Sequence, residues 1–237
     1  MEVASLYREP EQRQEPTFGA LELRDVFKIY RSGVVETVAL RGLDLRVEPG
    51  ELVAIFGPSG SGKSTALQLA AALDEPSAGD VRVLGRSLAR LDEQELARYR
   101  AREVAIVFQS GNLWPLLSAR ENVAIALRLG GRRDALAAAE EALRAVGLGG
   151  RTRVRASLLS GGEQQRVAIA AAAARRAPLV LADEPTAELD EANERVVLDA
   201  LRGLSVDLGS TVVVVTHSRR VVEAVDRVVE LRDGRAL

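Results

Sequence analysis

The sequence predicts an α/β protein whose mainly parallel sheet is covered by helices on both faces. The first observation is a set of short apolar runs bounded by turn residues, as buried strands are. These runs are residues 52–56, 104–108, 179–182 and 211–216. The second observation is that segments of helical periodicity lie between the runs. Strands that alternate with helices favour a parallel sheet.

Three segments supply the helical periodicity, namely residues 63–73, 133–146 and 193–204. Within residues 133–146 the apolar side chains fall on one face, as in an amphipathic helix. That segment stops at Gly147, a residue type common just past a helix end. Each segment therefore predicts a helix packed against the sheet or its neighbours.

The front of the chain has a different pattern. Residues 21–47 and 80–84 alternate, with glycines between, which predicts a smaller antiparallel sheet. Residues 88–160 are mostly helical in character and rich in Ala and Arg. We therefore expect one domain over residues 17–237, with an N-terminal antiparallel β subdomain and an α-helical subdomain over about residues 110–160.

Composition excludes several classes of protein. Of 237 residues, 47% are hydrophobic but only 3% aromatic, so the core must be aliphatic. A net charge of −2 gives no global field to hold nucleic acid, which we do not expect as a partner. The chain has no cysteine for a disulfide or a thiolate metal site.

No run approaches the roughly 18 apolar residues of a membrane span. Residues 1–16 lack the apolar middle of a secretion signal and predict a disordered tail.

A glycine-rich loop follows the first buried strand and opens a helix. It fits the phosphate-loop pattern with Gly57, Pro58, Ser59, Gly60, Ser61, Gly62, Lys63, Ser64 and Thr65. Such a loop turns backbone N–H groups and a helix N-terminus toward one anion. Lys63 would reach the β- and γ-phosphates, and the Ser64 hydroxyl would bind Mg²⁺. The alternative, a merely flexible loop, does not account for the strand before it and the helix after it.

The apolar strand at 179–182 runs into two acids, Asp183 and Glu184. Buried strands that end in paired carboxylates need a cation or a reaction to justify them. Asp183 would hold Mg²⁺ through water, and Glu184 would polarise an attacking water. The alternative, in which these acids are solvated or cap the next helix, stays open from this segment alone.

A second anion-binding helix start lies at Ser160, Gly161, Gly162 and Glu163. It uses the same N–H groups and helix dipole as the phosphate loop. Two such sites for one nucleotide make sense if the second serves a nucleotide held on another subunit. A bare Ser-Gly-Gly start would be an ordinary helix cap, but the eight residues from Leu159 to Arg166 are more specific than that.

Together these motifs resemble the nucleotide-binding subunit of an ABC transporter, over nearly everything from about Thr17 to the C-terminus. The resemblance implies a P-loop NTPase (RecA-like) core. It implies that Gln109 touches Mg²⁺ and senses a membrane partner. It also implies a dimer-contact loop at residues 187–190, which ends in Asp190, and a switch histidine, His217, at the γ-phosphate.

The resemblance further implies that Tyr30 stacks on adenine and that Val38 backs the ribose. Alone, a single histidine is more often structural than catalytic, and an aromatic such as Tyr30 often simply packs. Trp114 lies where the family meets its membrane partner, and core and interface remain open for it. The chain departs from the family pattern at residues 170–174 and at Ser218, neither of which touches the chemistry.

The resemblance implies an ATPase that uses ATP and Mg²⁺, with Glu184, His217 and Lys63 as catalytic residues. Two such subunits, expected to be identical, would pair head to tail around two ATP molecules and power a separate permease. The protein would lie on the cytoplasmic face of the cell membrane. Residues 112–117 and 73–76 resemble the branch of lipoprotein release and macrolide export, so we expect export or mechanical transmission. The alternatives are an importer subunit, a soluble non-transport ABC ATPase, and a regulatory ATP binder.

Overall fold

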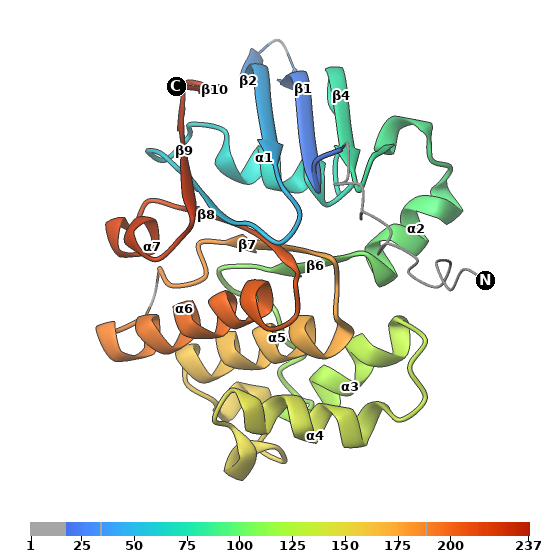
Figure 1. Cartoon of the computed structure of the whole chain (residues 1–237), viewed down its shortest axis with the longest axis vertical. Coiled ribbons are helices and arrows are strands. Elements are labelled where there is room, and N and C mark those ends of the chain that lie inside the picture. Colours follow the sequence, from blue (N-terminus) through green and yellow to red (C-terminus); the bar gives the residue numbers. More distant parts are fainter. Residues whose placement is uncertain (1–17, 34, 188) are drawn as a thin grey trace, which may run out of the picture.

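The computed structural model describes residues 18–33, 35–187 and 189–237. The predicted tail at 1–16 and Glu188 of the predicted dimer-contact loop lie outside the described residues. The chain forms two sheets with helices between and below them (Figure 1). The predicted α/β class with a separate antiparallel sheet is confirmed.

The smaller sheet has the strand order β2-β1-β4-β5, and its strand pairs are antiparallel. Its strands are β1 (Leu21–Ser32), β2 (Val35–Val47), β4 (Ala78–Val83) and β5 (Arg86–Ser87). The larger sheet has the order β10-β9-β3-β8-β7-β6, and all its pairs except β10 with β9 are parallel. Its strands are β3 (Leu52–Phe56), β6 (Val104–Val107), β7 (Leu179–Asp183), β8 (Thr211–Thr216), β9 (Arg227–Arg232) and β10 (Arg235–Ala236).

Helices separate the parallel strands, as the sequence predicts. They are α1 (Lys63–Ala70), α2 (Glu93–Arg102), α3 (Ala119–Leu129), α4 (Ala135–Ala145), α5 (Gly161–Arg175), α6 (Glu191–Val206) and α7 (Arg219–Glu223). Short 3₁₀ turns cover Leu88–Arg90, Gly149–Arg151 and Ala156–Leu158. Helices α2, α3 and α5 begin with capping boxes, in which an Asp or Ser side chain and a Glu three residues on bond each other's backbone N–H. These pairs are Asp92 with Glu95, Ser118 with Glu121, and Ser160 with Glu163.

The core consists of three layers of aliphatic side chains. Because neighbouring residues of a strand point to opposite faces, Val213 and Val215 pack toward α1 and the small sheet, while Val212 and Val214 pack toward α5 and α6. A third cluster joins α3 and α4 to α5. Helix α5 is thus covered on two sides, which accounts for its run of alanines.

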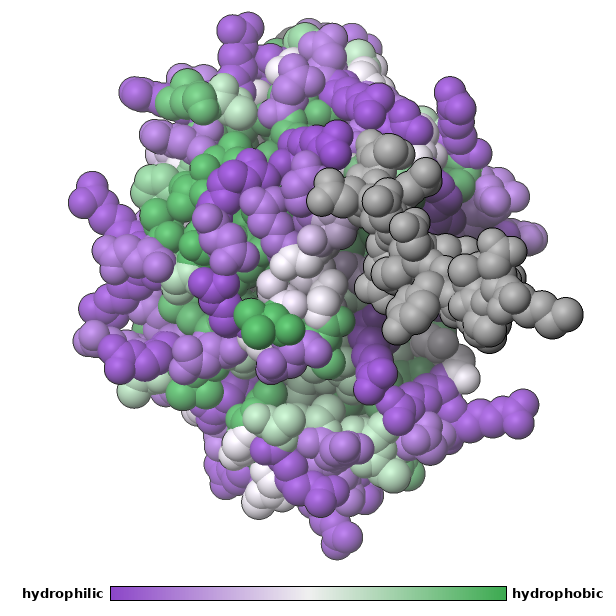
Figure 2. Space-filling model, viewed as in Figure 1, coloured by the Kyte–Doolittle hydropathy of each residue, from purple (hydrophilic) through white to green (hydrophobic). Residues whose placement is uncertain are grey.

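Several predicted boundaries differ from the structure. The helix predicted over 63–73 ends at Ala70, and Ala72 has a positive φ of 52° that is incompatible with a continuing helix. Strands β9 and β10 are short and each begins with an arginine, and they were not predicted. On the face shown in Figure 2, hydrophilic side chains are interspersed with hydrophobic patches. No helix in the described part of the chain is long and apolar enough to cross a membrane.

Candidate nucleotide site

The loop at residues 57–62 connects the carboxyl end of β3, a central strand, to the start of α1. Gly62 at the helix start has a φ of 103°, and a Cβ there would lie 2.6 Å from the carbonyl oxygen of Ala39 on β2. Only glycine allows that backbone conformation and that approach. The loop is therefore held against the small sheet beside Val38, which is partly buried.

The ammonium of Lys63 is directed into this loop. Lys63 is buried, and its Nζ donates to the carbonyl oxygens of Gly57 (2.9 Å) and Pro58 (3.0 Å). The buried Oγ of Ser61 has no hydrogen-bond partner among the described residues. A buried hydroxyl and a buried ammonium on one loop are groups that an oxyanion can satisfy.

Two predicted metal ligands meet across the site. The Ser64 hydroxyl, at the start of α1, donates to Oδ1 of Asp183 at the end of β7, over 3.2 Å. Burial raises the pKa of Asp183, and the charge of Glu184 acts in the same direction, while Ser64 and Lys63 oppose both. The site therefore places its carboxylate where a nearby cation would relieve the cost of the charge.

Glu184 and His217 form a second contact in this site. Nδ1 of His217 lies 2.8 Å from Oε1 of Glu184, whose other oxygen accepts from the Thr216 hydroxyl (3.3 Å) and the His217 N–H (3.4 Å). The His217 side chain is 65% exposed and that of Glu184 only 15%. Glu184 has a φ of 46°, a conformation that costs a non-glycine residue energy and that concentrates at functional sites.

Gln109 follows β6, which pairs in parallel register with β7, so it lies at the same sheet edge as Asp183. The backbone here is fixed by residues that sequence analysis missed. Buried Gln165 on α5 donates to the carbonyl oxygens of Phe108 and Gln109, and it accepts from Asn112. Gln165 stands among other polar residues at the start of α5, so the sequence carries no separate signal that it is buried.

Tyr30 lies on β1, and its partner strand carries Val38 opposite Ile29. The Tyr30 hydroxyl donates to Asp74 (3.0 Å), and Lys28 Nζ lies 4.9 Å from its ring centroid. Lys28 also binds Asp74, at 2.5 Å. Asp74 therefore holds the Tyr30 ring at its hydroxyl, and Lys28 lies over one face of the ring. Sequence analysis did not single out this pair.

The residues predicted to act on a partner's nucleotide lie at the N-terminus of α5. Ser160 and Gly161 are exposed, and Glu163 forms the capping box together with an ion pair to Arg151. That ion pair, with the Ser160 N–H, lowers the pKa of Glu163. In the described part of the chain no hydrogen bond or ion pair joins this group to the loop at 57–65.

The N-terminus of α5 also contacts the first turn of α6, which follows the predicted dimer-contact loop. A Cβ on Gly162 would lie 2.8 Å from Asn193 of α6, so the two helices touch there. Asp190 caps α6 by accepting from the Asn193 N–H at 2.8 Å, and Asn193 accepts from Arg166. Ser160 and Asp190 therefore lie on one connected surface.

Trp114 is 66% exposed, which places it at the surface and not in the core. Leu116 and Leu158 are exposed near it, since residues 115–117 bond the backbone of residues 156 and 157. The three side chains form an apolar patch beside the start of α3. We call it the Trp114 patch.

The residues present fit ATP and Mg²⁺. Among the described residues no three His, Cys, Asp or Glu side chains gather as a metal-binding group. Magnesium in nucleotide sites needs no such cage, since it takes one or two protein ligands plus phosphates and water. Ser64 and Asp183 offer that number, and the unpartnered Ser61 hydroxyl faces the same loop.

The fold and this loop define a P-loop nucleotide-binding protein. A family model described as "ABC transporter" matches residues 40–187, which is more than half of the chain. The chain belongs to the ABC transporter family and is an ATP-binding ATPase of that family.

Two curated relatives illustrate the match. The chain is 47% identical to the lipoprotein-releasing system ATP-binding protein LolD of Anaeromyxobacter dehalogenans, covering 91% of each chain. It is 45% identical to the macrolide export ATP-binding/permease protein MacB of Azoarcus sp., covering 90% of this chain but 33% of MacB. The chain therefore spans about a third of MacB's length and nine-tenths of LolD's.

Solved structures agree with the fold. The chain resembles the ATP-binding cassette MJ0796, solved as a dimer in a post-hydrolysis state bound to ADP and Pi, with a TM-score of 0.85 and 39% identity. The match covers 91% of this chain and 96% of that one. It also resembles cbiO1 of Clostridium perfringens, part of the ABC transporter complex cbiONQ, with a TM-score of 0.81 and 25% identity over 93% and 87% of the two chains.

Proposed function

We propose that this ATPase hydrolyses ATP at two sites formed between paired copies of the chain, and that pairing drives a separate membrane permease. One observation carries the proposal. The Glu184–His217 contact and the Ser64–Asp183 contact lie at the ends of neighbouring parallel strands, beside a phosphate loop. That arrangement supplies a base, a cation site and an anion site together.

Binding begins with the nucleotide's phosphates. Backbone N–H groups of residues 57–65 and the N-terminus of α1 attract the anion, and the Lys63 ammonium moves from the loop carbonyls to the β- and γ-phosphates. Tyr30 stacks on adenine, with its ring already held by Lys28 and Asp74. Val38 lies next to the ribose.

Ser64, Asp183 and Gln109 would hold Mg²⁺, with Asp183 acting through water. The ion supplies neutralisation of the charge that develops on the phosphate oxygens. The raised pKa of Asp183 is consistent with a carboxylate placed for a cation.

Glu184 takes a proton from the attacking water, a role for which its shielded carboxylate and fixed backbone suit it. His217 holds Oε1 of Glu184 through Nδ1 and turns its exposed ring edge toward the γ-phosphate. The Thr216 hydroxyl fixes the other carboxylate oxygen. The base is therefore oriented before ATP arrives.

The second half of each site comes from the partner copy. Ser160, Gly161 and Gly162, with Glu163 holding the helix start, present N–H groups and a helix dipole at the surface. Asp190 contributes to the contact between copies, since it lies on the same connected surface. Loss of the γ-phosphate removes the anion that joins the two halves, and the pair opens.

The Trp114 patch is the surface for the permease. The patch begins shortly after Gln109 in the sequence. A shift of Gln109 when the γ-phosphate is lost can therefore move the surface that contacts the permease. The likeness to LolD and MacB favours the branch of lipoprotein release and macrolide export, and the protein would lie on the cytoplasmic face of the cell membrane. The match to cbiO1 keeps the importer as the second candidate.

The decisive experiment is a pull-down of tagged Glu184→Gln from detergent-solubilised native membranes with ATP. We expect one integral membrane protein in near-equal amount, and we expect it to be lost from the double variant Trp114→Ala/Leu116→Ala. Its number of spans would choose between exporter and importer. Only soluble partners, across several detergents, would instead support a soluble ABC ATPase.

A further inference from the structure

A pocket of about 510 Å³ lies where helices α2, α3 and α5 end, and none of its lining residues belongs to the proposed nucleotide site. Four arginines line it: Arg102, Arg132, Arg175 and Arg176. No acidic side chain of the described residues lines it. In a chain with a net charge of −2, such a local excess of positive charge needs an explanation.

The four guanidiniums have few compensating charges. Arg175 donates to the carbonyl oxygens of residues 100, 101 and 104, and its buried Nε has no partner among the described residues. Burial lowers the pKa of Arg175. Arg102 and Arg176 form no ion pair with any described residue, while Arg132 binds the exposed Asp134 at 2.7 Å.

The simplest structural explanation is that arginines neutralise helix ends. A helix C-terminus is equivalent to about half a negative charge. Three helix ends therefore supply about 1.5 negative charges against three guanidiniums that lack a carboxylate. A surplus of about 1.5 positive charges remains, which matches the charge of about −1.5 to −2 on a phosphate group at neutral pH.

We propose that this pocket binds a phosphate-type dianion, through the guanidiniums of Arg102 and Arg176 together with Arg132 and Arg175. Arginine is the side chain best suited to this, because its planar N–H groups match phosphate oxygens in pairs. Arg102, Arg132 and Arg176 are exposed and thus reachable from solvent. The four arginines come from three segments, so the anion would tie the end of α2 to the loop after α3 and to the end of α5.

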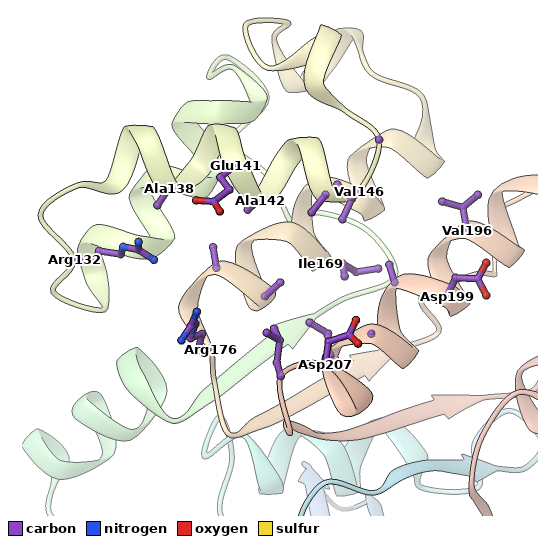
Figure 3. A pocket seen from close by; sticks show the side chains of 18 residues that line it. Arg132, Ala138, Glu141, Ala142, Val146, Ile169, Arg176, Val196, Asp199 and Asp207 are labelled. Carbon is purple, nitrogen blue, oxygen red and sulfur yellow. The ribbon is translucent and has the colours of Figure 1, made fainter.

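A neighbouring groove with acidic side chains bounds the proposed anion site on one side. Figure 3 shows this groove of about 660 Å³ between α4, α5 and α6, with Arg132 and Arg176 toward one end. The two cavities share Arg132, Ala174 and Arg176. Carboxylates line the groove but not the pocket, at Glu141, Asp199 and Asp207. They repel an anion, which is therefore confined to the arginine pocket.

The test is calorimetric titration of inorganic phosphate into the full chain loaded with Mg²⁺ and a non-hydrolysable ATP analogue, which also fills the γ-phosphate position, against sodium chloride of equal ionic strength. We expect phosphate to bind with one site per chain and to raise the melting temperature by a few degrees. Arg102→Gln/Arg176→Gln should weaken this binding at least tenfold and leave the affinity for the ATP analogue unchanged. Arg175 stays in place because it bonds the end of α2.

The matched control is Arg128→Gln/Arg133→Gln, which removes the same charge from exposed positions that do not line the pocket. It should bind phosphate as the unmodified chain does. Equal weakening in both double variants would overturn the proposal, because the effect would then be general charge. The proposal would also be overturned if the unmodified chain bound neither inorganic phosphate nor vesicles that contain phosphatidic acid.

Sedimentation with phosphatidylcholine vesicles, with and without phosphatidic acid, distinguishes the sources of phosphate. Binding of free phosphate without sedimentation assigns the site to a soluble phosphate compound. Sedimentation that requires phosphatidic acid, Arg102 and Arg176 assigns it to a lipid headgroup. Sedimentation that survives Arg102→Gln/Arg176→Gln, with no binding of free phosphate, would contradict the pocket.

Discussion

Nδ1 of His217 lies 2.8 Å from Oε1 of Glu184, across the ends of two neighbouring parallel strands. This contact orients the carboxylate that we assign as general base. Glu184→Gln keeps the shape and both hydrogen-bond positions but cannot take a proton. We expect kcat for ATP hydrolysis to fall by about 10²–10⁴-fold with ATP affinity retained, as measured by phosphate release and by titration of ATP. Hydrolysis at the unmodified rate would refute the assignment of the base.

Asp74 should influence nucleotide affinity without touching the phosphates, because it holds the Tyr30 hydroxyl. Burial acts to raise the pKa of Asp74, but hydrogen bonds from Lys28, the Glu75 N–H and Tyr30 outweigh it and lower that pKa. In Asp74→Ala the ring loses its fixed position. We expect the Kd for ATP to rise several-fold with kcat nearly unchanged, and Tyr30→Ala to have at least as large an effect. A Kd that stays constant in both variants would remove Tyr30 from the adenine site.

Glu194 is a buried carboxylate that joins α6 to the segment after His217. Its oxygens accept from the Ser218 hydroxyl (3.1 Å) and from Arg220 (3.0 Å). Glu194→Gln should release that segment and lower kcat with little change in KM, since ATP contacts lie elsewhere. Arg195→Gln, an exposed neighbour, is the control and should behave as the unmodified chain. Equal activity of both variants would show that Glu194 does not position His217.

Glu51 should make stability depend on pH. Its hydrogen bonds from Arg227 (2.6 and 3.0 Å), opposed by burial and helped by the Glu48 N–H, lower its pKa below the ordinary 4.5. A carboxyl with a lowered pKa in the folded state adds stability above about pH 4.5, and that stability is lost as the pH falls through the folded-state pKa.

Glu51→Gln should therefore cost about 1 kcal/mol of unfolding free energy at pH 7. The difference from the unmodified chain should shrink toward zero at pH 3. Urea unfolding at both pH values measures it. A difference that is constant with pH would exclude the ionised pair as its cause.

The elements that the sequence predicted best are those whose local signals agree. The strand at 52–56, the glycine loop and the helix after it each follow from residues in one short window. β9 was missed because its run is short and begins and ends with arginine, with exposed Glu230 interrupting the apolar residues, and because its partner β3 lies 174 residues earlier in the sequence (227 − 53). The local pattern of residues in a strand does not show which distant strand it will pair with.

The residues of the candidate site also fall into those that a local motif predicts and those that only the structure reveals. The motifs pointed to Lys63, Asp183 and His217 because each follows a strand or opens a helix. Gln165 and Asp74 could not be found from the sequence, since their roles depend on contacts made across the fold with residues 108, 109 and 30. Sequence motifs name the groups that we propose to meet the nucleotide, and the structure adds the residues that hold those groups in place.

The central claim is that a complete ATP site needs two copies of the chain. Light scattering on size-exclusion chromatography of Glu184→Gln tests it most directly, with and without ATP. We predict a molar mass of 25.4 kDa without nucleotide and twice that value with ATP. Ser160→Arg in the same background should bind ATP yet stay at the mass of one chain. A mass of 25.4 kDa for Glu184→Gln at saturating ATP, or a pair that Ser160→Arg leaves intact, would contradict the account.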